Sequence, residues 1–267
     1  MSQPDKHIVT EDGWSEFSSL TAARIALGRA GSSLPSRETL RFALAHAQAR
    51  DAVHTPLDDA ELARQLQADG HRVLLVHSAA VNRAEYLQRP DLGRRLDAVS
   101  RERLLAETRK GCDLLLVLAD GLSSRAAAQH ARPLLMELLP RLKEMDLQIG
   151  PLLLAREARV ALADEAGECL EAKMTVMLIG ERPGLSSPDS LGLYLTGAPR
   201  VGRSDAERNC ISNVRPDGLP CPLAAFKLAW LIAAARGAQT GIALKDNSAD
   251  DPGWAALLAR QARLAQR

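Results

Sequence analysis

The stretch Met174-Thr-Val-Met-Leu-Ile179, followed at once by Gly180-Glu-Arg-Pro-Gly184, decides the fold class of this chain. A short run of apolar and β-branched residues that ends at a Pro-Gly turn predicts a buried strand with a polar loop after it. In an open α/β sheet, the loops that leave the carboxyl ends of the strands border the crevice where ligands bind. The loop residues Glu181 and Arg182 are therefore candidate ligand contacts, and a plain chain reversal is the alternative.

Similar runs alternate with helical segments from residue 71 onward, which is typical of βαβ units and a mainly parallel sheet. The strands we expect are residues 73–77, 114–119, 152–155, 160–163, 174–179 and 191–195. The helices we expect are residues 94–109, 124–145 and 223–236. Because proline removes a backbone donor and clashes with the preceding turn, Pro133 and Pro140 predict a kink or a break in the second helix. The predicted fold class is α/β with a Rossmann-like domain.

Composition and hydrophobic pattern divide the chain into four parts, which are residues 1–19, 20–70, 71–245 and 246–267. The first is polar and aperiodic, which predicts a flexible or partner-docked arm. The second predicts a small helical N-terminal domain, with helices at 20–27, from a capping Ser36, and at 58–67. The third is the Rossmann-like domain, and the fourth is a tail with a helix that begins near Trp254.

Composition also excludes several classes of protein. The chain has 267 residues, of which 46% are hydrophobic, enough for an ordinary core. A net charge of +1 and an aromatic content of 3% argue against nucleic-acid binding, which needs a basic surface or stacking side chains. The apolar runs are far shorter than the roughly 20 residues of a membrane helix, and we expect a soluble cytoplasmic protein. Its four scattered cysteines fit free thiols better than two disulfides.

Two loops carry polar groups without a decisive catalytic pattern. Asp120-Gly-Leu-Ser-Ser124 joins an expected strand to an expected helix, so it can bind an anion with its N–H groups or simply cap the helix. Arg89-Pro-Asp-Leu-Gly-Arg-Arg95 places three guanidinium groups around a turn, as a solvated cluster or a subunit contact. Neither a Walker loop, a dinucleotide fingerprint nor a serine-hydrolase elbow is present. We therefore predict no catalytic and no metal-ligating residue.

Six phrases in this order resemble the small (light) subunit family of ethanolamine ammonia-lyase, over about residues 20–245. They are Gly28-Arg-Ala-Gly31, Leu40-Arg-Phe42, Arg89-Pro-Asp-Leu-Gly-Arg-Arg95, Asp120-Gly-Leu-Ser123, Gly180-Glu-Arg-Pro-Gly184 and Cys210-Ile-Ser-Asn213. Each phrase alone is weak. Their shared order over most of the chain makes the resemblance specific.

The resemblance implies a subunit of an adenosylcobalamin-dependent lyase that converts ethanolamine to acetaldehyde and ammonia by radical chemistry. In that family the cobalt corrinoid lies between a large barrel subunit, which carries the substrate site, and the small subunit. The chain alone is then expected to be inactive, because the cofactor and the partner carry the chemistry. The expected partner is the ethanolamine ammonia-lyase large subunit, in a higher hetero-oligomer of both chains, with no nucleic acid and no membrane.

The cobalamin contacts of the family, carried onto matching positions, fall on Val160, Glu181 and Cys210. Such contacts are largely backbone groups that pair with amides of the corrin, so the position of Cys210 is expected to matter more than its thiol. The Asp-x-His-x-x-Gly motif of histidine-ligated cobalamin domains is absent from the sequence. This agrees with base-on binding, in which this chain supplies no ligand to cobalt.

The sequence departs from the family pattern at both ends. It lacks the longer amino-terminal extension that is associated with bacterial microcompartments, and it adds a basic tail after Lys245. The cytoplasm is therefore the expected location, ahead of a microcompartment. Two other functions stay open: a noncatalytic Rossmann-like module that binds a ligand or a partner, and an independent α/β enzyme.

Overall fold

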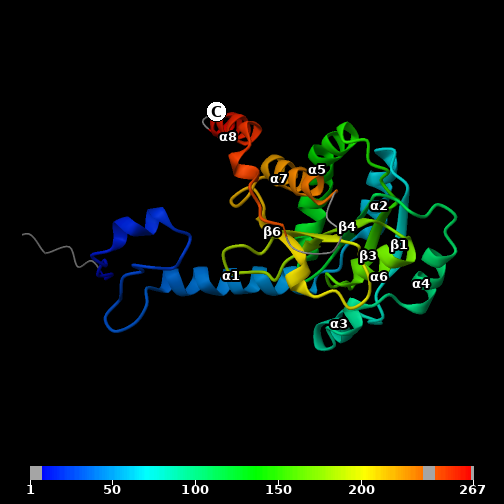
Figure 1. The fold of residues 1–267 in the computed structure, drawn as a ribbon. Coiled ribbons are helices and arrows are strands. Elements are labelled where there is room, and N and C mark those ends of the chain that lie inside the picture. Colours follow the sequence, from blue (N-terminus) through cyan, green and yellow to red (C-terminus); the bar gives the residue numbers. More distant parts are fainter. Residues whose placement is uncertain (1–7, 237–243, 266–267) are drawn as a thin grey trace, which may run out of the picture.

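The computed structural model describes residues 8–236 and 244–265, and its centre is a six-stranded sheet (Figure 1). The strands lie in the order β1-β3-β2-β4-β5-β6. Their bounds are β1 Val73–His77, β2 Leu114–Ala119, β3 Leu152–Arg156, β4 Met174–Gly180, β5 Leu191–Gly197 and β6 Arg208–Val214. The pairs from β1 to β4 in this order are parallel, whereas β5 and β6 join through antiparallel pairs. The expected α/β fold with a mainly parallel sheet is confirmed.

Helices connect the parallel strands and cover the sheet. Their bounds are α1 Ser36–His54, α2 Asp59–Ala68, α3 Arg83–Gln88, α4 Ala98–Leu105, α5 Ser124–Glu144, α6 Leu162–Cys169, α7 Cys221–Ala235 and α8 Pro252–Ala265. Short 3-10 turns lie at Ser15–Leu20, Leu92–Arg94, Asp205–Glu207 and Ser248–Asp250. Because parallel crossovers are right-handed and the chain reverses direction along the sheet after β2, α5 lies on the opposite face to α4 and α6.

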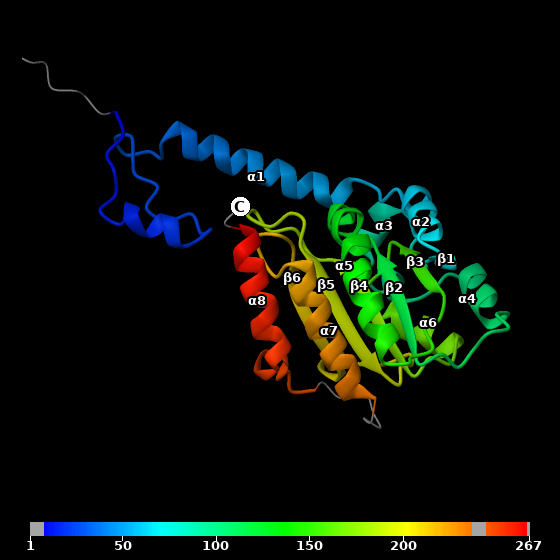
Figure 2. The same ribbon diagram turned by 90° about the horizontal axis from the view of Figure 1, so that it is seen from above.

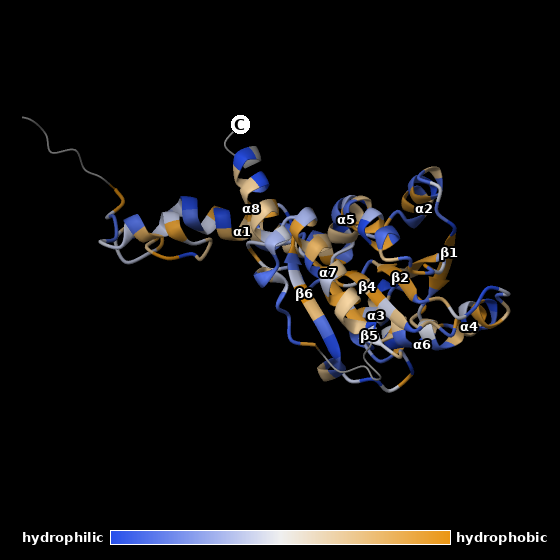
Figure 3. Cartoon of the chain, turned by 45° about the horizontal axis from the view of Figure 1, so that its top comes forward, coloured by the Kyte–Doolittle hydropathy of each residue, from blue (hydrophilic) through white to orange (hydrophobic). Residues whose placement is uncertain are grey.

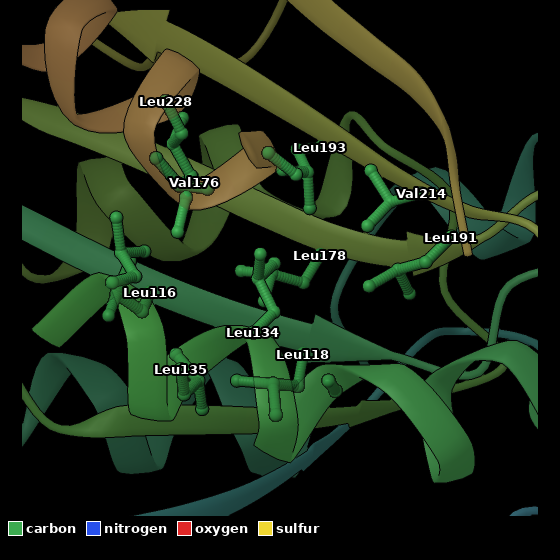
Figure 4. Close-up of a cluster of buried hydrophobic side chains, with 14 of the residues drawn as sticks. Leu116, Leu118, Leu134, Leu135, Val176, Leu178, Leu191, Leu193, Val214 and Leu228 are labelled. Atoms are coloured by element: carbon green, nitrogen blue, oxygen red, sulfur yellow. The ribbon is translucent and has the colours of Figure 1, made fainter. Parts of the chain in front are cut away.

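The larger core lies between the sheet and helices α2, α5 and α7 (Figure 2). Strand β2 is buried along its whole length because both of its faces are covered. Leu116 and Leu118 of β2 pack with Leu134 and Leu135 of α5 (Figure 4). Alternate residues of the same strand face the other core, as the two-residue period of a strand requires. Figure 3 shows these apolar strands enclosed between the helices.

The smaller core lies on the opposite face, under α4 and α6. Leu104 of α4 and Leu162 of α6 are fully buried in it. On this face, helix α6 packs on β4 and helix α4 packs on β1. The helices of this face therefore cover the parallel strands. Beyond β4, Tyr194 of β5 is only partly buried and Cys210 of β6 is exposed. We call this part of the sheet the uncovered face, and it is defined by Tyr194 and Cys210, with the buried Gly192 beside them on β5.

Three expected elements differ from the structure. Residues 160–163 are not a strand but a turn that leads into α6. A short apolar run fits a strand or a helix equally well, and here Leu162 and Ala166 recur at helical spacing and face the core. Residues 20–27 are not helical, since a 3-10 turn ends at Leu20 and irregular chain follows. The helix expected at 94–109 is limited to α4.

Helix α5 runs without a break through both of its prolines. Pro133 and Pro140 are exposed and lie two helical turns apart, so they share the solvent side of the helix. The carbonyl groups that lose their donors there can be hydrated, which removes most of the cost of a buried break. At the start of α1, Ser36 is the first helical residue and does not cap the helix, because Pro35 holds the N-cap position.

The amino-terminal segment and the first half of α1 project away from the sheet (Figures 1 and 2). Thr10 and Arg29 form an isolated bridge in this segment, and a Cβ on Gly28 would lie 2.8 Å from the carbonyl oxygen of Thr10. Helix α2 packs on the sheet through Leu62 and Leu66. The division into an arm, a helical domain and a Rossmann-like domain stays a prediction. Residues 1–7, 237–243 and 266–267 of those parts lie outside the described residues.

Candidate functional site on the uncovered face of the sheet

The carboxyl ends of β2 and β3 form the crevice where this topology commonly binds ligands, because the helices that follow them lie on opposite faces. Here the chain fills the crevice with its own groups. Asp120 is buried and accepts hydrogen bonds from the backbone N–H groups of Glu157 (3.0 Å) and Ala158 (3.2 Å). Nη1 of Arg83 lies 3.2 Å from Asp120 and 3.0 Å from Glu157. Burial, followed by the charge of Glu157, raises the pKa of Asp120 to about 6.

The loop after Asp120 caps helix α5. The hydroxyl oxygen of Ser123 accepts a hydrogen bond from the N–H of Ala126 (3.2 Å), and the hydroxyl donates to the carbonyl of Pro188 (2.7 Å). The interpretation of this loop as a helix cap is confirmed. A Cβ on Gly180 would lie 2.0 Å from the carbonyl oxygen of Ser123, so the end of β4 packs directly on the loop. This close approach explains why the last residue of β4 is a glycine.

Glu181 is the first residue after β4, and its side chain is fixed in place. Its backbone N–H donates to the carbonyl of Ser190 (2.9 Å). Its carboxylate accepts hydrogen bonds from the Ser190 hydroxyl and from the backbone N–H of Asn213 (3.1 Å). Gly192 leaves room beside it, since a Cβ there would lie 2.9 Å from Oε1 of Glu181 and 3.0 Å from Cε2 of Tyr194. Glu181 therefore lies at the border of the uncovered face.

Cys210 lies directly opposite Tyr194 in the antiparallel pair of β5 and β6. Although Cys210 is exposed as a residue, partial desolvation of its sulfur raises the pKa of the thiol, and the contact with Tyr194 offsets only part of that effect. Burial likewise raises the pKa of Tyr194. Both side chains are therefore neutral near pH 7, and the thiol is not activated as a nucleophile.

Val160 lies in the turn before α6 and, like Tyr194, packs against the smaller core. The two residues line a cavity of about 320 Å³, together with Pro90, Arg94, Arg159, Ala161, Arg203, Ser204 and Asp205. The structure thus brings Val160, Glu181 and Cys210 together around Tyr194, although the three are far apart in the sequence. Tyr194 was missed by sequence reasoning. The sequence does place Tyr194 in the expected strand at 191–195. Its contact with Cys210, however, depends on the pairing of β5 with β6, a strand that the sequence does not predict.

The amino-acid sequence matches the sequence model of the family "Ethanolamine ammonia-lyase light chain (EutC)" over residues 11–245. The chain belongs to the ethanolamine ammonia-lyase light-chain family. It is 56% identical over 242 residues to the ethanolamine ammonia-lyase small subunit of Ralstonia nicotianae, and the match covers 89% of this chain and 90% of the relative. The small subunits of Azotobacter vinelandii and Pseudomonas aeruginosa are 55% and 53% identical, with 91% of this chain and 92% of each relative covered.

The resemblance inferred from the six phrases is therefore confirmed. The family match includes Val160, Glu181 and Cys210 and ends before the tail. Helix α8 of the tail lies against α7, where the rings of Phe226 and Trp254 have centroids 6.0 Å apart.

A buried ion pair joins α6, which follows the turn of Val160, to β6, which carries Cys210. Arg208, two residues before Cys210, donates hydrogen bonds to both carboxylate oxygens of Asp164 in α6, at 2.6 and 2.7 Å. Both side chains are 1% exposed. The guanidinium also donates to Oγ1 of Thr196 (2.9 Å) and lies 3.2 Å from Asp205. This pair fixes β6 relative to the start of α6.

The arginine-rich loop Arg89-Pro-Asp-Leu-Gly-Arg-Arg95 serves more than one purpose. Arg89 pairs with Asp91 at 2.7 Å on the surface, and Arg95 pairs with the buried Glu165 at 3.2 Å. Arg94 reaches the cavity beside Val160. The loop is therefore part of the surroundings of the candidate site as well as a charged surface.

Across residues 8–236 and 244–265, no group of three or more His, Cys, Asp or Glu side chains is arranged to hold a metal ion. All four cysteines are free thiols, as expected. No helix in the described part of the chain is both long and apolar enough to span a bilayer.

Proposed function

We propose that the chain is the small subunit of an adenosylcobalamin-dependent ethanolamine ammonia-lyase, and that its uncovered face holds the corrinoid against a large subunit. The proposed enzyme is a carbon-nitrogen lyase, a cytoplasmic hetero-oligomer of both chains. Membership of the light-chain family supports the subunit role. One observation supports this position for the binding site. Val160, Glu181 and Cys210 lie around Tyr194, on a part of the sheet that no helix of the described chain covers.

The groups on this face suit a large, flat, amide-rich cofactor. Gly192 has no side chain between Glu181 and Tyr194, and a single Cβ would already crowd both. The carboxylate of Glu181 is an acceptor for an amide N–H, and Tyr194 supplies a partly buried aromatic surface. The thiol of Cys210 adds no charge, because partial desolvation of its sulfur keeps its pKa above the ordinary value. Backbone groups of the edge strand β6 give further polar partners.

The chemistry and the binding are divided between the components. When bound, adenosylcobalamin supplies the radical chemistry that the conversion of ethanolamine to acetaldehyde and ammonia requires. The residues of this chain that would hold the cofactor are Val160, Glu181 and Cys210, and they would orient it and shield it from water. The carboxylate of Glu181 accepts hydrogen bonds from Ser190 and Asn213, which fixes it as a hydrogen-bond acceptor rather than a mobile acid or base. We therefore propose that the chain is inactive without its partner.

The experiment that tests this function is co-expression of the chain with its large subunit, followed by an assay of acetaldehyde release. We expect release that needs ethanolamine, both chains and added adenosylcobalamin, and no release from either chain alone. Turnover by the small chain alone would contradict the division of labour. A folded complex that is saturated with cofactor and still inactive would favour a noncatalytic binding module.

A further inference from the structure

The cavity beside Val160 is rich in arginine, and two of its arginines pair with no carboxylate in the part of the chain that the structure describes. Arg203 is engaged, since Nη1 lies 2.6 Å from Glu207. Arg94 and Arg159 also line the cavity, and neither forms an ion pair with any residue that the structure describes. The cavity also contains Asp205, whose carboxylate lies 3.2 Å from Nε of Arg208 and is thus partly neutralised. The net character of the cavity is cationic.

Arg159 is held rigidly at the wall of this cavity. Its guanidinium lies over the ring of Tyr86, 4.5 Å from the centroid, and its backbone N–H donates to the carbonyl of Gly93 at 2.7 Å. A Cβ on Gly93 would lie 2.8 Å from the Tyr86 ring and 2.9 Å from Cγ of Arg159. The glycine of the arginine-rich loop therefore permits this packing. Nε of Arg159 is buried without a hydrogen-bond partner in the described chain.

Backbone donors add to the positive character of the cavity. Val160 and Ala161 line the cavity directly before the first turn of α6. Among the described residues, none accepts a hydrogen bond from the N–H of Val160 or Ala161. Free N–H groups at the start of a helix favour an anion. Arg94 and Arg159, which form no ion pair with the described residues, and these N–H groups together make a site for one small anionic group.

We propose that this cavity binds the phosphodiester of the nucleotide loop of the corrinoid, an inference that rests on the proposed function. The peripheral side chains of cobalamin are neutral amides, whereas the phosphodiester carries a negative charge that guanidinium groups bind well. Val160 belongs both to the cavity and to the expected corrinoid contacts. The cavity is thus adjacent to the proposed position of the cofactor, and Arg94 and Arg159 are its specificity-determining residues.

The first test uses the unaltered complex of both chains and three corrinoids. Cyanocobalamin has the full nucleotide loop, cobinamide lacks both phosphate and nucleotide, and cobinamide phosphate retains only the phosphate. Their dissociation constants are measured by absorbance titration. We expect cobinamide phosphate to bind about tenfold or more tightly than cobinamide. Equal binding of these two would overturn the phosphate site, whereas binding of none of the three would overturn the proposed function itself.

The second test assigns the effect to the two arginines. In the same complex, Arg94→Gln and Arg159→Gln should each weaken the binding of cyanocobalamin and cobinamide phosphate about tenfold or more. The binding of cobinamide should change less than about twofold, because it has no phosphate to lose. Arg89→Gln is the matched control, since Arg89 is in the same loop but pairs with Asp91. An equal loss for all three corrinoids would show general damage and overturn the assignment.

Discussion

The buried pair of Asp164 and Arg208 provides the sharpest prediction about stability. Asp164→Asn removes the charge from a side chain that is 1% exposed and leaves the guanidinium of Arg208 buried without its main partner. Removing one member of a buried pair costs about 3–5 kcal/mol. Here Arg208 keeps its bond to Thr196, and Asp205 remains 3.2 Å away, so the expected loss is about 3 kcal/mol.

The assay is urea unfolding at pH 7, followed by circular dichroism. Asp205→Asn is the matched control, because Asp205 contacts the same guanidinium but is 85% exposed, and its loss should cost at most about 1 kcal/mol. Replacing both charges, with Asp164→Leu and Arg208→Met, should destabilise the chain less than Asp164→Asn alone, since no uncompensated charge stays buried. A cost for Asp164→Asn of less than about 1 kcal/mol, or one equal to that of the control, would mean that Asp164 does not balance a buried charge on Arg208.

Two further predictions concern the closed crevice. Gly180→Ala should destabilise the chain by at least about 2 kcal/mol in the same urea assay, because the new Cβ would lie 2.0 Å from the carbonyl oxygen of Ser123. Gly13→Ala is the control and should be neutral, since a Cβ at Gly13 meets no atom within 4 Å. The pKa of Asp120 is raised in the folded state to about 6, so the folded chain binds a proton more tightly than the unfolded chain. The unfolding free energy of the unaltered chain, relative to that of Asp120→Asn, should therefore rise by about 1–3 kcal/mol between pH 7 and pH 4. A pH-independent difference would mean that Asp120 is not desolvated as described.

The central strands could be predicted from the sequence because burial on both faces makes them continuously apolar. Residues 114–119 and 174–179 are of this kind, and both were placed correctly. Strand β6 was not predicted. Its sequence Arg208-Asn-Cys-Ile-Ser-Asn-Val214 is mostly polar, because few of its residues are buried and no helix of the described residues covers one of its faces. Hydrophobic pattern alone does not reveal a strand of this composition.

The candidate site was predictable only in part. Val160, Glu181 and Cys210 came from the family resemblance, and the structure brings them together because β5 and β6 fold back beside β4. Tyr194 and Arg159 could not be recognised in advance, because their roles depend on contacts between distant segments. Their assignment to cobalamin binding stays a proposal. The loop at Asp120 left two interpretations open, and only the observed bonds of Ser123 identify it as a cap.

The most direct test of the account is the affinity of the two-chain complex for cyanocobalamin when Cys210 is replaced. Cys210 is exposed on the uncovered face, so Cys210→Trp should fill the proposed corrinoid position and weaken binding about tenfold or more, with assembly of the two chains unchanged. Cys210→Ser keeps the size of the side chain and should bind within about threefold of the unaltered complex. Unchanged affinity in the tryptophan variant would contradict the claim that this face holds the cofactor.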